Sequence, residues 1–245
     1  MPQSNMMQSN LLQPNIIQED NDIIICHKPA GIATQTGRLG QKDMESLLRN
    51  YRAGKGEDTY IGIVHRLDQP VEGVMVFAKN KKAAAALSAQ VQNHKMGKHY
   101  LAVAHLPAEE SDSMMLPQQG TLTDYLVFDQ RSNRTTVLSE KEAAHPQGGQ
   151  KPQKAVLDYE IRKRRDDMAL FDIALHTGRH HQIRVQLANM GCPIVGDRKY
   201  GGADDTVQEK QLALCAYRLV FFHPSTGEKK DVSIIPQNPA FRLFF

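Results

Sequence analysis

Short runs of alternating hydrophobic and polar residues fill most of the chain, and clusters of Gly, Pro, Asn and Asp separate them. Runs of this length and period predict β-strands. Strand pairs are expected within 16–31 and 63–79, the second pair around the turn QPVEG. Single strands are expected at 98–106 and 121–130, a hairpin at 154–175, and two closing strands at 212–224 and 231–235.

Three segments have helical spacing instead. Asp43 precedes MESLLRNYRAG, a short capped helix that Gly54 would end, and residues 81–97 are rich in Ala. Apolar residues recur at helical intervals in 180–191, which Gly191 would end. Residues 108–120 and 139–153 are expected to be loops. Because strands outnumber helices and mostly adjoin one another, the sequence predicts an α+β fold with a mixed, largely antiparallel sheet flanked by helices.

Composition indicates a soluble, cytoplasmic, globular protein. The first residues repeat a polar unit, so 1–15 are expected to be a mobile tail and 16–245 a single domain. We find neither a membrane-length apolar stretch nor a signal peptide, and Cys26, Cys192 and Cys215 are scattered as reduced thiols would be. A net charge of +3 permits a nucleic-acid partner without indicating one.

Most cofactor motifs are absent from the sequence. It contains no GxGxxG, GxxxxGK[ST], GxSxG or HExxH pattern. His176, His180 and His181 lie close together in the sequence, but Gly178 interrupts any helix that would align them, and no pair of Cys residues is near. We therefore expect no metal and no cofactor.

Asp68 is the most unusual polar residue, because it ends an apolar run. It is either a turn residue paired with Arg66 or a carboxylate kept ionised in a partly dry cleft. Local spacing does not distinguish between these two interpretations.

Five stretches, taken together, resemble the RluA-type pseudouridine synthases. HRLDQPVEG is similar to that family's HRLD-x-x-TSG signature, and KHYLAV is similar to its K-x-Y-x-A segment. IIQEDNDIIICHKPAG, LHTGRHHQIRVQLANMG and CPIVGDRKYGG resemble its other motifs, in the family's order. The N-terminal S4 domain that many relatives carry is not expected in this chain.

The resemblance implies a pseudouridine synthase fold with a central RNA-binding cleft and a cofactor-free isomerisation of uridine in structured RNA. It makes Asp68 the catalytic carboxylate, which either attacks C1′ or removes the C2′ proton, Arg184 its basic partner and Tyr100 the aromatic residue beside the uracil. Arg66 would enter the RNA stack. Arg179, His180 and His181 would bind RNA. The implied partner is rRNA or tRNA, with no membrane, and the protein is expected to be a monomer.

Three positions depart from the family pattern. Val71 and Glu72 stand where the family has Thr and Ser, and we expect the Glu72 charge near the path of the phosphate backbone. His180 replaces a threonine. A non-catalytic RNA-binding relative is therefore the alternative, and a glycoside hydrolase is more distant because no second carboxylate is placed by a motif. The basic run 162–165 is either a solvated hairpin face or a phosphate contact.

Overall fold

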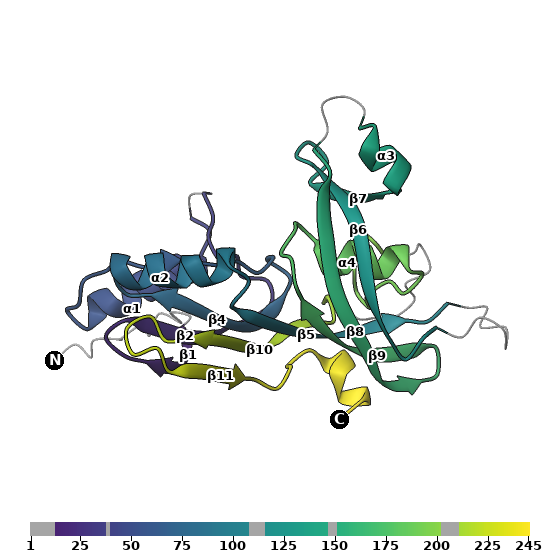
Figure 1. Ribbon diagram of the computed structural model, residues 1–245. Coiled ribbons are helices and arrows are strands. Elements are labelled where there is room, and N and C mark those ends of the chain that lie inside the picture. Colours follow the sequence, from purple (N-terminus) through teal and green to yellow (C-terminus); the bar gives the residue numbers. More distant parts are fainter. Residues whose placement is uncertain (1–12, 38–39, 108–115, 147–150, 202–210) are drawn as a thin grey trace.

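The computed structural model describes residues 13–37, 40–107, 116–146, 151–201 and 211–245. Within them, eleven strands form one sheet in the order β1-β2-β4-β10-β5-β9-β8-β6-β7, while β3 pairs with β4 and β11 pairs with β10 (Figure 1). The strands are β1 (Asn15–Glu19), β2 (Ile23–Lys28), β3 (Gly62–Ile63), β4 (Glu72–Ala78), β5 (Gly97–His105), β6 (Gln119–Asp129), β7 (Arg134–Leu138), β8 (Gln153–Arg165), β9 (Met168–Leu175), β10 (Leu214–Phe222) and β11 (Lys229–Ser233). Of these strand pairs only β4 with β10 is parallel, so the predicted α+β fold is confirmed.

Helices form where the sequence supplies caps. The helices are α1 (Met44–Gly54), α2 (Lys81–Gln92), α3 (Glu140–Ala144) and α4 (Gln182–Asn189), with a 3₁₀ turn η1 at Pro239–Leu243. Asp43 caps α1 by accepting a hydrogen bond from the Ser46 amide at 2.7 Å, as expected. Asn80 caps α2 in the same way through the Ala83 amide.

Different helices lie against different parts of the sheet. Figure 1 shows α1 and α2 near β2 and β4, whereas α4 lies near β8, and β6 and β7 rise away from the sheet with α3 near their tip. Alternate residues of β2 and β4 enter two apolar clusters, one that includes α1 and one that includes α2. Side chains on both faces of β2 and β4 are therefore buried. This packing fixes the part of the sheet beside which the cleft lies.

Two sequence predictions about secondary structure were wrong. Residues 64–68 are not a strand, because side chains supply the hydrogen bonds that a ladder would have made. Thr34 Oγ1 bonds both the amide and the carbonyl of Leu67, and the Val76 amide donates to the His65 imidazole. Part of the predicted loop at 139–153 is α3, whose capping box joins Ser139 and Glu142.

Other expectations concern the N-terminal tail, one loop, the cysteines and membrane-spanning helices. Residues 1–12, which form most of the expected tail, and residues 108–115 lie outside the described residues. All three cysteines are buried, and none of them forms a disulfide within the described residues. Among the helices described, none combines the length and the apolar character needed to cross a membrane.

Gly73 allows an unusually close approach between β4 and β10. A Cβ atom placed on this residue would lie 2.4 Å from the Ala216 Cβ and 2.8 Å from the Ala216 carbonyl oxygen. Real side chains do not reach such separations, so position 73 requires glycine for the two strands to pair in parallel.

Candidate active site

The loop that carries Asp68 is fixed by the segment after β2. The Gly31 amide donates to the Gln69 carbonyl at 2.8 Å, and the Gln69 side chain donates back to the Gly31 carbonyl. The fully buried Lys28 ammonium donates to the carbonyl oxygens of Pro29, Ile32 and Gln69, at 3.1, 2.6 and 3.2 Å. One lysine therefore ties the two loops together. Burial lowers the Lys28 pKa to about 8, although Asp68 and Glu72 act in the opposite direction.

His65 holds the other end of the same loop. Its Nε2 atom accepts the Val76 amide hydrogen at 3.1 Å, which requires a neutral ring with its proton on Nδ1. Burial, assisted by the Lys98 charge, lowers the His65 pKa to about 3, so the ring stays neutral at physiological pH.

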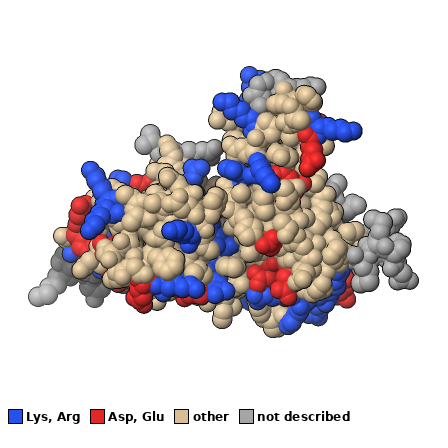
Figure 2. Space-filling view, in the orientation of Figure 1, with Lys and Arg blue, Asp and Glu red and all other residues tan. Residues whose placement is uncertain are grey.

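A cleft of about 290 Å³ lies between α2 and the loop before α4. Its walls come from the loop 65–71, from β5 and from residues 178–184. All seven predicted site residues line it, namely Arg66, Asp68, Tyr100, Arg179, His180, His181 and Arg184. Segments more than a hundred positions apart in the sequence thus meet around one concave surface. Figure 2 shows Lys and Arg side chains gathered where the part of the molecule with α1 and α2 meets the part with β6 and β7.

Asp68 lies beside two nitrogen groups in this cleft. Its Oδ2 atom is 3.8 Å from Arg184 Nη1 and 3.6 Å from His181 Nε2. The Asp68 side chain is 33% exposed, whereas both partners are 6% exposed. The predicted pairing of Asp68 with Arg184 is therefore present, and the carboxylate remains open to a ligand.

The stronger partner of Arg184 is Asp197, which the sequence interpretation missed. Arg184 Nε and Nη2 donate to the two oxygens of Asp197 at 2.7 Å each, and the Asp197 side chain is fully buried. Asp197 also accepts the backbone amides of Lys199 and Tyr200. This arrangement fixes the guanidinium plane and aims Nη1 at Asp68. Asp197 and Tyr200 belong to the CPIVGDRKYGG motif, which was the available signal in the sequence.

His181 is oriented by Tyr200. The Tyr200 hydroxyl accepts the Thr135 amide hydrogen at 2.8 Å and lies 2.8 Å from His181 Nδ1. We assign the hydroxyl proton to the bond with Nδ1, because the Thr135 amide can only donate and Nδ1 is the neighbour that can accept this proton. The remaining imidazole proton is then on Nε2, which faces Asp68. Burial and the neighbouring Arg184 charge lower the His181 pKa to about 3, so this ring is also neutral.

Tyr100 forms part of the cleft wall from the middle of β5. The residue is 7% exposed, and its strand neighbours belong to the main core. Burial, together with the negative charge of Asp68, raises the pKa of the Tyr100 phenol well above its usual value. The phenol therefore keeps its proton at physiological pH.

The remaining predicted residues lie at the mouth of the cleft. Arg66 is exposed there, and Arg179 donates from Nε to the Lys154 carbonyl at 3.1 Å. His180 is half-buried between two rings, Phe128 at 4.0 Å and His181 at 3.7 Å between centroids.

The basic run 162–165 has a structural role that neither sequence interpretation described. Lys163 Nζ donates to the Phe244 carbonyl at 2.6 Å, and Arg165 donates to the Leu243 carbonyl at 2.9 Å. Arg162 pairs with Asp172 in the neighbouring strand. These side chains hold the C-terminal turn η1 against the β8–β9 hairpin.

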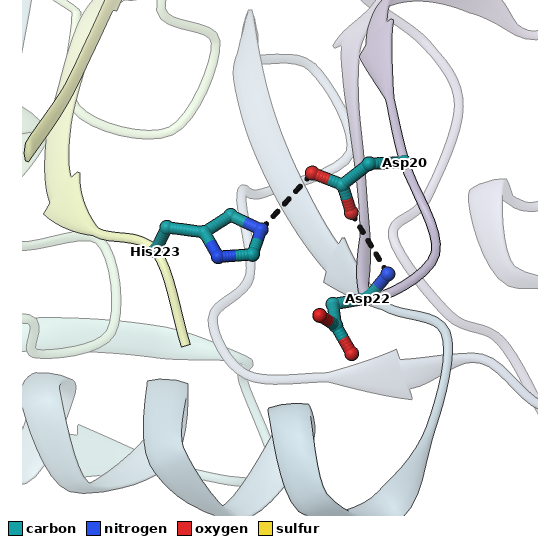
Figure 3. Close-up of side chains that lie close together, drawn as sticks. All are labelled: Asp20, Asp22 and His223. Carbon is teal, nitrogen blue, oxygen red and sulfur yellow. Dashed lines mark hydrogen bonds and ion pairs between the residues drawn. The ribbon is translucent and has the colours of Figure 1, made fainter. Parts of the chain in front are cut away.

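A second group of titratable side chains lies far from the cleft. Figure 3 shows Asp20, Asp22 and His223, with His223 Nε2 at 3.0 Å from Asp20 Oδ2 and the Asp22 amide at 2.8 Å from Asp20 Oδ1. His223 Nδ1 accepts the amides of Ser225 and Thr226. Because these atoms already bond one another, the cluster joins the β1–β2 turn to the turn after β10, and we assign it a structural role.

Comparison with known proteins gives the family. The model of the RNA pseudouridylate synthase family matches residues 22–189, a segment that includes Asp68, Tyr100 and Arg184. The chain belongs to this family. The resemblance to RluA-type pseudouridine synthases is thereby confirmed.

Relatives and a solved structure agree with this assignment. An uncharacterized RNA pseudouridine synthase of Bacillus subtilis, YhcT, is 33% identical over 213 residues, which cover 86% of this chain and 64% of the relative. The ribosomal large subunit pseudouridine synthase D of Pasteurella multocida is 33% identical over 224 residues, which cover 86% and 63%. This chain thus spans less than two thirds of either relative. The structure of human RNA Pseudouridylate Synthase Domain Containing 4 superimposes with a TM-score of 0.70 at 23% identity, covering 91% of this chain and 89% of that one.

Val71 and Glu72, which depart from the RNA pseudouridylate synthase pattern, lie in two different environments. Val71 is buried and lines the cleft, so the methyl groups stand where the family pattern has a threonine. Glu72 is 3% exposed and accepts the backbone amides of Gln237 and Asn238 at 3.0 to 3.1 Å. The expectation that the Glu72 charge lies along the phosphate path was wrong, because its carboxylate is buried against the C-terminal segment.

Proposed function

We propose that this chain isomerises specific uridines in structured RNA, rRNA or tRNA, to pseudouridine, with Asp68 as the catalytic carboxylate. The observation that carries the proposal is the placement of Asp68 in a cleft, 3.8 Å from a buried arginine and open to a ligand. Tyr100 contributes to the wall of the same cleft.

The reaction needs a group that acts on the sugar. The N1–C1′ bond breaks, the uracil turns, C5 bonds to C1′, and the C5 proton leaves while N1 gains a proton. The net change neither oxidises nor reduces the nucleoside, so the proposed reaction requires no redox cofactor or metal. Asp68 acts at the ribose, at C1′ or at the C2′ hydrogen.

Arg184 and His181 prepare the carboxylate for this role. The Arg184 guanidinium gives the Asp68 carboxylate a fixed cationic neighbour at 3.8 Å. His181 presents a neutral N–H to the same oxygen, and both groups are fixed before RNA binds. Asp197 and Tyr200 supply that fixation, which limits the reorganisation that the reaction requires.

Tyr100 acts as a neutral phenol. A protonated ring in the cleft wall offers a face for the uracil and an O–H near the carbon that loses its hydrogen. Its raised pKa supports stacking and hydrogen donation rather than a role as a phenolate base.

RNA binding is assigned to the mouth of the cleft. Arg66 enters the RNA stack where the uridine leaves, which offsets part of an unstacking cost of a few kcal/mol. Arg179, His180 and His181 contact the surrounding nucleotides. We further propose that residues 16–245 act as one catalytic domain, as a monomer, in the cytoplasm, where the three scattered cysteines would stay reduced.

The test uses tritium release from RNA labelled at uridine C5, taken from cells that lack this chain. The native protein is expected to release tritium to water and to leave RNA mass unchanged, whereas Asp68→Asn releases none and binds RNA normally. Asp58→Asn is the matched control, since the exposed Asp58 accepts a hydrogen bond from the Tyr60 amide and does not line the cleft.

Three outcomes would contradict the proposal. Tritium release by Asp68→Asn at the native rate would remove Asp68 from the mechanism. RNA binding by the native protein without release would identify a non-catalytic relative with an altered turn. Free uracil as the product would identify a glycoside hydrolase.

A further inference from the structure

A second hollow of about 550 Å³ adjoins the cleft near the turn of the β6–β7 hairpin. Arg179 and His180 line both cavities, so the two open onto one continuous surface. The rest of the second hollow comes from the end of β6, including Phe128, from Thr135 in β7 and from Lys151 before β8. A ligand that extends out of the cleft past His180 reaches this hollow next.

Three aromatic rings connect the hollow with the candidate catalytic carboxylate. Phe128 is 42% exposed, and its ring lies 4.0 Å from the His180 ring, at 41° to it. The His180 ring lies 3.7 Å from the His181 ring, whose Nε2 atom is 3.6 Å from Asp68. Exposed aromatic rings next to a basic groove are the surfaces on which unpaired nucleobases stack.

The middle ring of this series is held rigidly. The Thr135 hydroxyl donates to the His180 carbonyl at 2.9 Å, so its oxygen can accept the proton on His180 Nδ1 at 3.0 Å. Burial lowers the His180 pKa, which keeps the ring neutral. His180 stands where the family pattern has a threonine, and that exchange provides the ring on which Phe128 packs. The stack is therefore a feature of this chain's own side chains.

The charges around the hollow suit a phosphate backbone. Lys151 and Arg179 lie on its rim. Asp129 also lines it, but its carboxylate accepts the Arg131 amide at 2.9 Å and the Ser132 hydroxyl at 2.6 Å within the hairpin turn. The lining thus combines an exposed ring with two cations, and its one acid is engaged in local hydrogen bonds.

We propose that Phe128 and His180 form a stacking platform for an unpaired nucleobase that neighbours the target uridine in the RNA chain. Lys151 and Arg179 contact the phosphates of that nucleotide. This inference rests on the proposed function, since it places the neighbouring base relative to a uridine held at Asp68. It assigns the second hollow to the selection of single-stranded RNA around the modified position.

The experiment measures binding of a fluorescein-labelled RNA hairpin with an unpaired uridine loop, by anisotropy over a range of salt concentrations. Every variant carries Asp68→Asn, so that no turnover occurs. Phe128→Leu keeps an apolar side chain but loses the ring, and is expected to weaken binding about tenfold. Phe128→Tyr is expected to stay within about twofold of the parent, because it keeps the stacking face.

Salt dependence separates stacking from charge. Phe128→Leu should leave the slope of log affinity against log salt unchanged, whereas Lys151→Gln should reduce that slope by about one. Phe222→Leu is the matched control, because Phe222 is 44% exposed at the end of β10 and lines neither hollow. It is expected to bind as the parent does.

The results separate this inference from the proposed function. Parental affinity of Phe128→Leu, or an equal loss in Phe128→Tyr, would overturn the platform. A reduced salt slope in Phe128→Leu would also overturn it, because the ring would then act by positioning the hairpin's charges. Tritium release by the otherwise native protein is measured separately, so either idea can fail while the other stands.

Discussion

Arg184 and Asp197 form a buried two-pronged ion pair, with both nitrogen to oxygen distances at 2.7 Å. The pair sets the direction of the third guanidinium nitrogen, which lies 3.8 Å from Asp68. The orientation of the candidate catalytic carboxylate's partner therefore depends on an acid that does not itself face the cleft.

Asp197→Asn is expected to reduce the turnover rate about a hundredfold with little change in KM. The amide accepts one of the two bonds and frees the guanidinium to rotate, and small misplacements at a reacting group cost rates of this size. The free energy of unfolding should fall by about 3 kcal/mol, because a buried charge loses its partner. Single-turnover tritium release and urea unfolding measure the two effects.

Asp231→Asn is the control, because Arg218 and Asp231 form the same two-pronged contact at 2.7 and 2.6 Å with both side chains 40% exposed. Its cost should stay below about 1 kcal/mol, with a normal turnover rate. Equal effects of the two variants on turnover would contradict the role of Asp197.

Lys28→Met is expected to lower activity strongly, because the loop that carries Asp68 loses the donor that its Gln69 carbonyl shares with Pro29 and Ile32. Stability should respond in a pH-dependent way. The folded pKa of about 8 lies below the unfolded value, so the buried charge is unfavourable below pH 8 and this penalty disappears as the pH rises toward about 10.5.

Native stability relative to Lys28→Met should therefore rise by about 2 kcal/mol between about pH 7 and pH 9.5. Urea unfolding at both pH values measures the difference, and Lys95→Met serves as the exposed control. A difference that is constant with pH would show that the Lys28 ammonium is not penalised by burial.

His65→Gln is expected to make the free energy of unfolding depend less on pH in the acidic range. His65 is neutral in the folded protein, with a pKa of about 3, but takes up a proton near pH 6.5 when unfolded. Its contribution is complete above about pH 6.5 and is lost as the pH falls, by about 2 kcal/mol between about pH 7 and pH 5. The glutamine carbonyl can still accept the Val76 amide.

The comparison is made by urea unfolding at about pH 7 and pH 5, with the exposed His145→Gln as the control. His181 also has a lowered pKa, so the variant should retain part of the native slope. A native slope in His65→Gln would mean that the imidazole is not held neutral.

Glu72→Gln is expected to leave RNA affinity and its salt dependence unchanged. The side chain is buried and accepts the amides of Gln237 and Asn238, so removing its charge should instead lower the free energy of unfolding by about 1 to 2 kcal/mol. Anisotropy and urea unfolding measure these quantities. Tighter RNA binding by the variant would restore the idea that this charge lies along the phosphate path.

The sequence predicted which residues line the cleft better than it predicted the local backbone structure. Asp68, Tyr100 and Arg184 line one cleft as predicted, because the motifs that carry them form a loop, a strand and a helix that meet there. The strand expected at residues 64–68 is absent, since Thr34 and His65 replace the ladder hydrogen bonds through their side chains. Hydrophobic periodicity contains no information about such replacements.

Lys28 and Asp197 lie in motifs that resemble those of the family, but local patterns do not show which side chains they support. Asp197 acts through Arg184, and Lys28 acts through the carbonyl of Gln69, so neither contributes a recognisable pattern near Asp68 in the sequence. The direction of Glu72 depended on the C-terminal segment, which is more than 160 positions away. Burial and long-range partners decide these cases, and both arise only when the chain has folded.

Gly73 has a consequence for how this turn can be varied. Residue 71 lines the cleft, residue 72 anchors the C-terminal segment, and residue 73 has no room for a side chain beside Ala216. Variation of this turn that keeps the scaffold is therefore confined to position 71, where exchanging a methyl for a hydroxyl alters the surface of the cleft.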